Sequence, residues 1–318
     1  MFAMLQSRWL IIPILITGAL GVVVCTSAQE HWFPSRWGAD DERGAMNLLT
    51  PAKVLEAVSL VKTGQVYQLG RVYERGMPLY GERQFNMYIP ASTTAAGVGT
   101  NRLTYHEEVL TTEIGQVGTQ FDGLGHIGIG DLFYNGLDRR EFATPYGLDK
   151  LGVENVGVFV TRGVLLDVAA YKNVAILPDN YEITVEDITG TLAREQVDIR
   201  EGDVVIFHTG WGSLWMVDND RYNAGEPGPG IAAARWLADK GMVMAGADSW
   251  SVEVMPNPNP DLANPVHQEW ITKRGIHNLE NLDTAALARD AVYEFMFVFS
   301  PLRLKGGTGS PGNPIAIR

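Results

Sequence analysis

Short apolar runs of strand length recur along most of this chain, and they limit its fold more than any other feature. Glycine or polar residues bound each run, as is typical of strands within a sheet. The runs cover residues 66–69, 108–114, 156–159, 164–167, 203–208 and 242–245, with a further strand-rich stretch at 293–304. Segments whose apolar residues repeat at the helical period lie between the runs, at residues 52–62, 186–195, 230–240 and 264–273. Strands therefore outnumber helices, and the sequence predicts an α/β fold with a mixed, curved, barrel-like β core and surrounding helices.

The composition is that of a globular protein, and the net charge argues against one class of partner. Of the 318 residues, 46% are hydrophobic and 19% are charged, which is typical of a globular protein rather than a disordered one. No internal repeat or long linker appears after residue 30, so we expect a single domain. The net charge of −12 argues against nucleic acid as a partner, because such binding needs a basic surface that displaces the phosphate counterions.

The amino terminus has the layout of a secretory signal peptide. Arg8 precedes an apolar run at 9–24, and small residues then lead to a polar segment. We expect cleavage after Ala28, which divides the chain into a signal peptide, 1–28, and a mature domain, 29–318. The sequence therefore predicts an exported protein, periplasmic or extracellular, with no stable membrane association after cleavage.

Cys25 is the single cysteine of the chain, which excludes an intramolecular disulfide. It also lies in the segment that we expect to be removed or buried in membrane, so thiol catalysis drops out as a mechanism. Two alternatives to cleavage stay open: an uncleaved membrane anchor, or a lipid attached to Cys25. Each of the three places the body of the protein outside the cytoplasm, and amino-terminal sequencing of the mature protein distinguishes them.

Residues 116–126, Gln-Val-Gly-Thr-Gln-Phe-Asp-Gly-Leu-Gly-His, combine flexible backbone with polar side chains. Three glycines interleave with Thr119, Asp122 and His126, so the backbone can bend sharply and bring these side chains to one centre. Asp122 would supply a hard anionic oxygen, and His126 either a nitrogen ligand or a proton acceptor. A glycine-rich turn with a capping aspartate and a surface histidine remains the alternative.

A second polar pair lies near the carboxyl terminus. His267 opens an apparently helical segment, and Glu280 stands in an apolar context where an unpaired carboxylate would be costly. A buried glutamate usually has a cation beside it, and a set of Asp, His and Glu side chains suits Zn²⁺ or Mn²⁺. The alternative is that Glu280 pairs with Lys273 or Arg274 and that His267 caps a helix.

Together these residues resemble the cyclase family, which includes bacterial kynurenine formamidase and isatin hydrolase. That family has the pattern His-x-Gly-Thr-His-x-Asp-x-Pro-x-His, followed later by a histidine roughly a dozen residues before a glutamate. Four residues match the pattern in register: Gly118, Thr119, Asp122 and His126. His267 precedes Glu280 by thirteen residues. The resemblance covers nearly all of the mature chain and extends to residues 37–47, 162–167, 209–211, 246–250 and 306–311.

The chain departs from the pattern at the first two histidines, which are Gln116 and Gln120 here, and at the proline, which is Leu124. In the family those histidines bind metal, and a carboxamide oxygen is a much weaker ligand than an imidazole. We therefore expect one divalent ion, Zn²⁺ or Mn²⁺, rather than two. The resemblance implies that Asp122, His267 and Glu280 hold it. The further candidate ligands are Gln120 and Gln116.

The resemblance also implies a hydrolase that opens an amide, lactam or lactone bond in a small, often aromatic or cyclic, substrate. Asp122 would hold the metal, and His126 would act as the general base that takes a proton from water. Candidates for the substrate pocket are Thr119, Phe121, Tyr134, Trp211 and Trp250, with ordinary core packing as the alternative for each aromatic residue. Many members of the family are dimers or tetramers, so a homo-oligomer is expected by resemblance.

Two other functions remain as alternatives. The glutamine replacements favour a metal-free binding protein or an inactive relative, and the family name suggests a cyclase or dehydratase of polyketide-like substrates. A serine hydrolase is excluded because no Gly-x-Ser-x-Gly turn occurs. A nucleotide-binding protein is excluded because no phosphate-binding loop ends in Lys-Ser or Lys-Thr.

Overall fold

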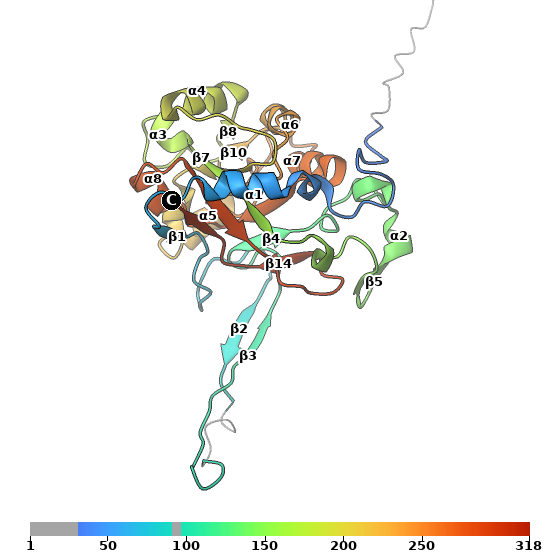
Figure 1. The fold of residues 1–318 in the computed structure, drawn as a ribbon, viewed down its shortest axis with the longest axis vertical. Helices are drawn as coiled ribbons and strands as arrows, with labels where there is room; N and C mark the ends of the chain where they lie inside the picture. The colour runs from blue at the N-terminus through green and yellow to red at the C-terminus, as the bar shows by residue number, and fades with distance from the viewer. Residues whose placement is uncertain (1–30, 91–96) are drawn as a thin grey trace, which may run out of the picture. The chain divides into compact units, whose positions relative to one another are not determined.

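A nine-stranded mixed sheet forms the centre of the fold and curls strongly around its core (Figure 1). In spatial order its strands are β1 (Val66–Gln68), β15 (Ile315–Ile317), β13 (Glu294–Phe299), β7 (Phe159–Asp167), β9 (Val204–His208), β11 (Met244–Ala247), β12 (His277–Glu280), β4 (Gln120–Asp122) and β14 (Gly309–Pro311). The four central strands, β7, β9, β11 and β12, run parallel, and the strands on either side of them pair antiparallel. The predicted α/β fold with a mixed, curved β core is confirmed.

The computed structural model describes residues 31–90 and 97–318, and residues Trp32–Arg318 form one compact unit. The predicted signal peptide, 1–28, with its cleavage site and Cys25, lies outside the described residues. Within the described part of the chain, no helix has the length and apolar character needed to cross a membrane.

The parallel strands are buried along most of their length because helices cover them. The helices are α1 (Pro51–Val58), α2 (Arg139–Phe142), α3 (Val168–Tyr171), α4 (Val185–Glu195), α5 (Asn219–Ala224), α6 (Ile231–Asp239), α7 (Pro265–His267) and α8 (Ala285–Arg289). Helix α1 packs on β7 and β13, and α4 packs on β7, α3 and α6. Strands β9 and β11 are buried on both faces and are mostly apolar, which is why the 203–208 and 242–245 runs are recognisable in the sequence.

Helix starts follow their sequence signals closely. The Thr50 side chain accepts a hydrogen bond from the backbone N–H of Lys53 at 3.4 Å, and Pro51 occupies the first turn of α1. At the start of α4, Thr184 and Asp187 cap each other's backbone reciprocally. The predicted helix at 264–273 is present as α7, continued by a wider π-helical turn over Gln268–Arg274.

Several strand predictions need correction. The predicted strand at 156–159 is wrong, because a 3₁₀ turn (Val153–Asn155) and Gly157, with φ of +99°, delay the strand until Phe159. The 293–304 stretch is a strand only over Glu294–Phe299. Strands β4, β12 and β14 were not predicted, because each is three or four residues long and rich in glycine or polar side chains.

The predicted strand at 108–114 exists but lies outside the main sheet. It forms β3 (Val109–Thr112), which pairs antiparallel with β2 (Phe85–Tyr88) as a separate two-stranded ribbon (Figure 1). Most of its side chains are exposed. Two smaller ribbons complete the described structure: β5 (Ala143–Thr144) with β6 (Gly147–Leu148), and β8 (Glu182–Ile183) with β10 (Gly228–Pro229).

Strand β4 divides its three side chains between the two faces of the sheet. Gln120 and Asp122 lie on one face, and Phe121 lies on the other because successive side chains of a strand alternate. The ring of Phe121 packs against Phe159 and Phe299, with centroids 5.6 and 5.4 Å away, and it is fully buried. The expectation that Phe121 lines a substrate pocket is therefore wrong, and it is a core residue.

Replacing Phe121 by Ala should lower the free energy of unfolding by about 3–5 kcal/mol, because it leaves a cavity among packed aromatic rings. Denaturant-induced unfolding measures the change, and Phe121→Leu should cost less. A loss below about 1 kcal/mol together with weakened substrate binding would place Phe121 in a pocket instead.

Candidate metal centre

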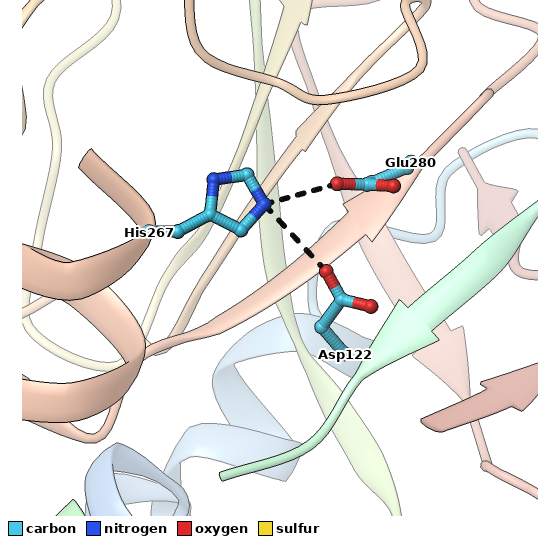
Figure 2. A group of neighbouring side chains, drawn as sticks. All are labelled: Asp122, His267 and Glu280. Atoms are coloured by element: carbon cyan, nitrogen blue, oxygen red, sulfur yellow. Dashed lines mark hydrogen bonds and ion pairs between the residues drawn. The ribbon is translucent and has the colours of Figure 1, made fainter. Parts of the chain in front are cut away.

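Three buried side chains from separate elements meet at one point, as Figure 2 shows. Asp122 ends β4, Glu280 ends β12, and His267 ends α7. The Nε2 atom of His267 lies 3.2 Å from Oε1 of Glu280 and 3.8 Å from Oδ2 of Asp122. One ligand atom of each residue falls within 4.8 Å of the others, which is close enough for a single ion to contact all three.

The pairing of β4 with β12 aligns the two carboxylates. The strands are antiparallel, with Gln120 opposite Glu280 and Asp122 opposite Asn278. Residues two apart on a strand share a face, so Asp122 and Glu280 project from the same side of the sheet. His267 approaches that side from α7, with an exposure of only 3%.

Thr119 fixes the start of β4 against the end of β12. Its hydroxyl donates to the backbone carbonyl of Asn281 at 2.7 Å and accepts from the backbone N–H of Arg71 at 2.8 Å. Both of its hydrogen-bonding roles are therefore used within the protein. Thr119 stabilises the strand pair, and it does not line a substrate pocket as expected.

Glu253 orients His267 and was missed in the sequence. Its carboxylate accepts from Nδ1 of His267 at 2.5 Å and from the backbone N–H groups of Val266 and His267, each at 3.1 Å. With Nδ1 held in this way, Nε2 is the nitrogen that faces Asp122 and Glu280. The sequence carries one signal for this role: Glu253 lies between two valines, an apolar context like that of Glu280.

Gln116 and Gln120 both bond to Glu280. Their side-chain amides both donate to Oε2 of Glu280, the Gln116 bond at 2.5 Å. The side-chain oxygen of Gln120 accepts from the backbone N–H of Gln116 at 2.6 Å. Gln120 therefore presents N–H rather than oxygen to the centre. Both glutamines hold Glu280. The side-chain oxygen of Gln116 has no partner, so its role as a further ligand stays a prediction.

The charges at the centre are tightly coupled. Burial raises the pKa of Asp122 to about 7; His126 opposes that shift, Glu280 adds to it, and His267 opposes it. Burial alone would lower the pKa of His267, but Glu253 and Glu280 outweigh it and raise that pKa well above its ordinary value. Without an ion, His267 therefore carries a proton near neutral pH, and Asp122 is partly protonated.

A divalent ion fits this arrangement. Oδ2 of Asp122 is buried and has no hydrogen-bond partner, which is unusual for a carboxylate oxygen in a protein interior. It faces an imidazole nitrogen beside a second carboxylate, and this set of nitrogen and oxygen donors suits Zn²⁺ or Mn²⁺. An ion bound between them would satisfy the unpartnered oxygen and replace the proton on His267.

His126 stands beside the centre with access to solvent. Its Nε2 lies 3.8 Å from Oδ1 of Asp122, and 27% of its side chain is exposed. The turn at Gly123 places it there, because the backbone N–H of His126 donates to the Gly123 carbonyl at 3.1 Å. A histidine next to a buried carboxylate and in contact with water can accept and release a proton.

The remaining predicted pocket residues lie elsewhere. Tyr134 packs in a separate core cluster, where its hydroxyl donates to Asp41 at 2.7 Å. Trp211 is buried, and its indole N–H donates to the Tyr222 carbonyl at 3.2 Å. The polar atoms of both residues are bound within the core, and their role in a pocket stays a prediction. Trp250 differs, because it stacks on the half-exposed Tyr80 with ring centroids 4.2 Å apart.

Comparison with known proteins agrees with the fold. Residues 67–254 match the Putative cyclase family, and the chain belongs to that family. A crystal structure described as that of a novel cyclase is 30% identical, with a TM-score of 0.81 and coverage of 91% of this chain and 97% of the other. No curated protein matches the chain in sequence.

Two less similar structures share the fold. Isatin hydrolase A from Ralstonia solanacearum has 20% identity and a TM-score of 0.61, covering 85% of this chain and 98% of that one. A structure of predicted metal-dependent hydrolase from Bacillus stearothermophilus has 21% identity and a TM-score of 0.51, covering 80% and 98%. The resemblance inferred from the sequence motifs is confirmed at the level of the family.

Glu253→Gln should weaken binding of Zn²⁺ or Mn²⁺ by about 10–100-fold, because His267 loses the carboxylate that fixes its orientation. Competition with a chelator measures the affinity. Glu226→Gln is the matched control, since Glu226 is also buried but binds the backbone N–H groups of Trp250 and Ser251. Equal losses in both variants would show a general effect of buried charge instead.

Metal affinity should rise between about pH 6 and pH 8, because bound metal must displace the protons on His267 and Asp122. The raised pKa values of both groups set the sign: lower pH fills these positions with protons that compete with the ion. Calorimetric titration in buffers of different ionisation enthalpy counts the protons released. An affinity that does not change over this range would contradict the assignment of these two residues.

Proposed function

We propose that this chain is a metal-dependent hydrolase that opens an amide, lactam or lactone bond in a small, cyclic or aromatic substrate. One observation carries the proposal: the buried, unpartnered oxygen of Asp122 faces His267 and Glu280, with the half-exposed His126 on the other side of the same carboxylate. This arrangement places an ion-binding set and a solvent-accessible proton acceptor within a few ångströms of each other.

Asp122, His267 and Glu280 would hold the ion, and Glu253 and the two glutamines would hold these ligands in place. A bound divalent ion supplies a Lewis acid that makes water more acidic and polarises a carbonyl group. The centre is buried, so charges there interact more strongly than they would in water.

His126 would move the proton. Its Nε2 accepts a proton from the attacking water and then donates it to the nitrogen or oxygen that leaves. The neighbouring Asp122 carboxylate, 3.8 Å away, stabilises the imidazolium that exists between these two steps. The water oxygen ends in the new carboxylate of the product, and no other reactant is required.

The class of substrate is supported by structural relatives. The isatin hydrolases share the fold, and one of them is bound to the product analogue thioisatinate. Tyr80 is 39% exposed and stacks on the buried Trp250, so one aromatic ring faces the protein exterior. Lactams, lactones and N-acyl aryl amides are therefore the first compounds to assay.

A metal-free binding protein is the second candidate, and one observation favours it. Gln116 and Gln120 already satisfy Oε2 of Glu280 with two amide hydrogen bonds, which stabilises that carboxylate without any ion. In that case the protein would bind a small ligand without turnover.

His126→Asn should lower the rate of hydrolysis by about 10²–10⁴-fold while metal content stays unchanged, because the variant loses the proton acceptor but no ligand. Mass spectrometry of the product formed in ¹⁸O-labelled water shows whether the carboxylate takes up solvent oxygen. His208→Gln is the control, since His208 bonds Thr284 at 2.6 Å at the end of β9, outside the centre. Full activity in His126→Asn, or a product that has lost water, would contradict the proposed reaction.

A further inference from the structure

Asn278 is the most conspicuous buried polar side chain that the proposed mechanism does not use. It is fully buried in β12, and neither its Nδ2 nor its Oδ1 has a hydrogen-bond partner. Buried carboxamides are nearly always paired, because the group loses its hydrogen bonds to water when the chain folds. The neighbouring buried asparagine, Asn281, follows this rule: it donates to the Gly118 carbonyl at 2.8 Å and accepts from the Tyr222 hydroxyl at 2.7 Å.

The position of Asn278 in the sheet places it on the face of the metal centre. It is two residues from Glu280 on the same strand, so the two side chains share a face. The side chains of His277 and Leu279, on either side of Asn278, go to the other face, where the ring of His277 lies 4.9 Å from that of Phe121. Across the strand pair, Asn278 is directly opposite Asp122.

Two unpartnered groups therefore lie side by side on adjacent strands. Directly paired residues in a sheet have Cβ atoms roughly 5 Å apart, so Asn278 is within reach of whatever the unpartnered Oδ2 of Asp122 binds. The two side chains do not bond each other. An atom bound between them could contact both Oδ2 of Asp122 and the amide of Asn278. The site already implies such an atom, namely an ion held by Asp122.

We propose that Asn278 is a further ligand of the metal centre, with its Oδ1 donating to the ion beside Asp122, His267 and Glu280. This inference rests on the proposed metal-dependent function. A neutral amide oxygen suits this position, because the two carboxylates already balance the charge of a divalent ion. Three oxygen donors with one nitrogen also favour Mn²⁺ over ions that prefer nitrogen or sulfur.

The test compares Mn²⁺ binding and apo-protein stability in variants of the full chain. Asn278→Leu keeps the volume but removes the oxygen, Asn278→Ala removes the side chain, and Asn278→Asp restores an oxygen. Titration calorimetry should show at least about tenfold weaker Mn²⁺ binding for the Leu and Ala variants and no loss for Asp. Without metal, Asn278→Leu should unfold at the same temperature as the wild type or higher, because it removes an unpaired buried amide.

Asn281→Leu is the matched control, since it removes a buried asparagine whose groups are both paired and should lower the unfolding temperature. If the wild type binds Mn²⁺ and the Leu and Ala variants bind it equally well, the inference is overturned and the proposed function stands. If the wild type binds neither Mn²⁺ nor Zn²⁺, both fail. If Asn278→Leu does not fold, Asn278→Ala supplies the same comparison.

Discussion

The pairing of β4 with β12 is the constraint on which the rest of the site depends. Antiparallel register places Gln120 opposite Glu280 and Asp122 opposite Asn278, so four polar side chains share one face of a buried sheet. If the register of the two strands shifted by one residue, these polar side chains would turn toward the aromatic core. Phe121 and Leu279 would then face the candidate metal centre. Thr119 stabilises this register from the end of the strand, through its hydrogen bond to the backbone of Asn281.

The side chains on that face include several buried ionisable groups. Asp122 and Glu280 are buried close together, and His267 lies between them and Glu253. Moving several ionisable groups out of water costs free energy, and the attraction between their opposite charges offsets only part of that cost. The two glutamines offset part of that cost at Glu280, and a divalent ion would offset the rest at Asp122. The site therefore has the charge and the donor atoms to hold a cation.

The apolar runs of the sequence predicted the fold class, and its motifs resemble those of the cyclase family. That resemblance implied the three residues that meet in space. The sequence did not predict the short strands β4 and β12, whose polar side chains hide the alternation of a strand. For the same reason Phe121 was assigned to a pocket, since its face of the sheet depends on that strand. Asn278 is recognisable only through its lack of partners in the folded protein, and the role of Glu253 only through its bond to His267.

The central claim is that the buried Asp122, His267 and Glu280 hold one divalent ion, and the metal content of the purified protein tests it most directly. Elemental analysis after incubation with Zn²⁺ and Mn²⁺ should find about one ion per chain in the wild type, and almost none in Asp122→Ala. Absence of metal from the wild type would contradict the account and favour the binding protein. Gln116 and Gln120 bond to Glu280, which indicates a centre for a single ion. Two ions per chain would contradict that number.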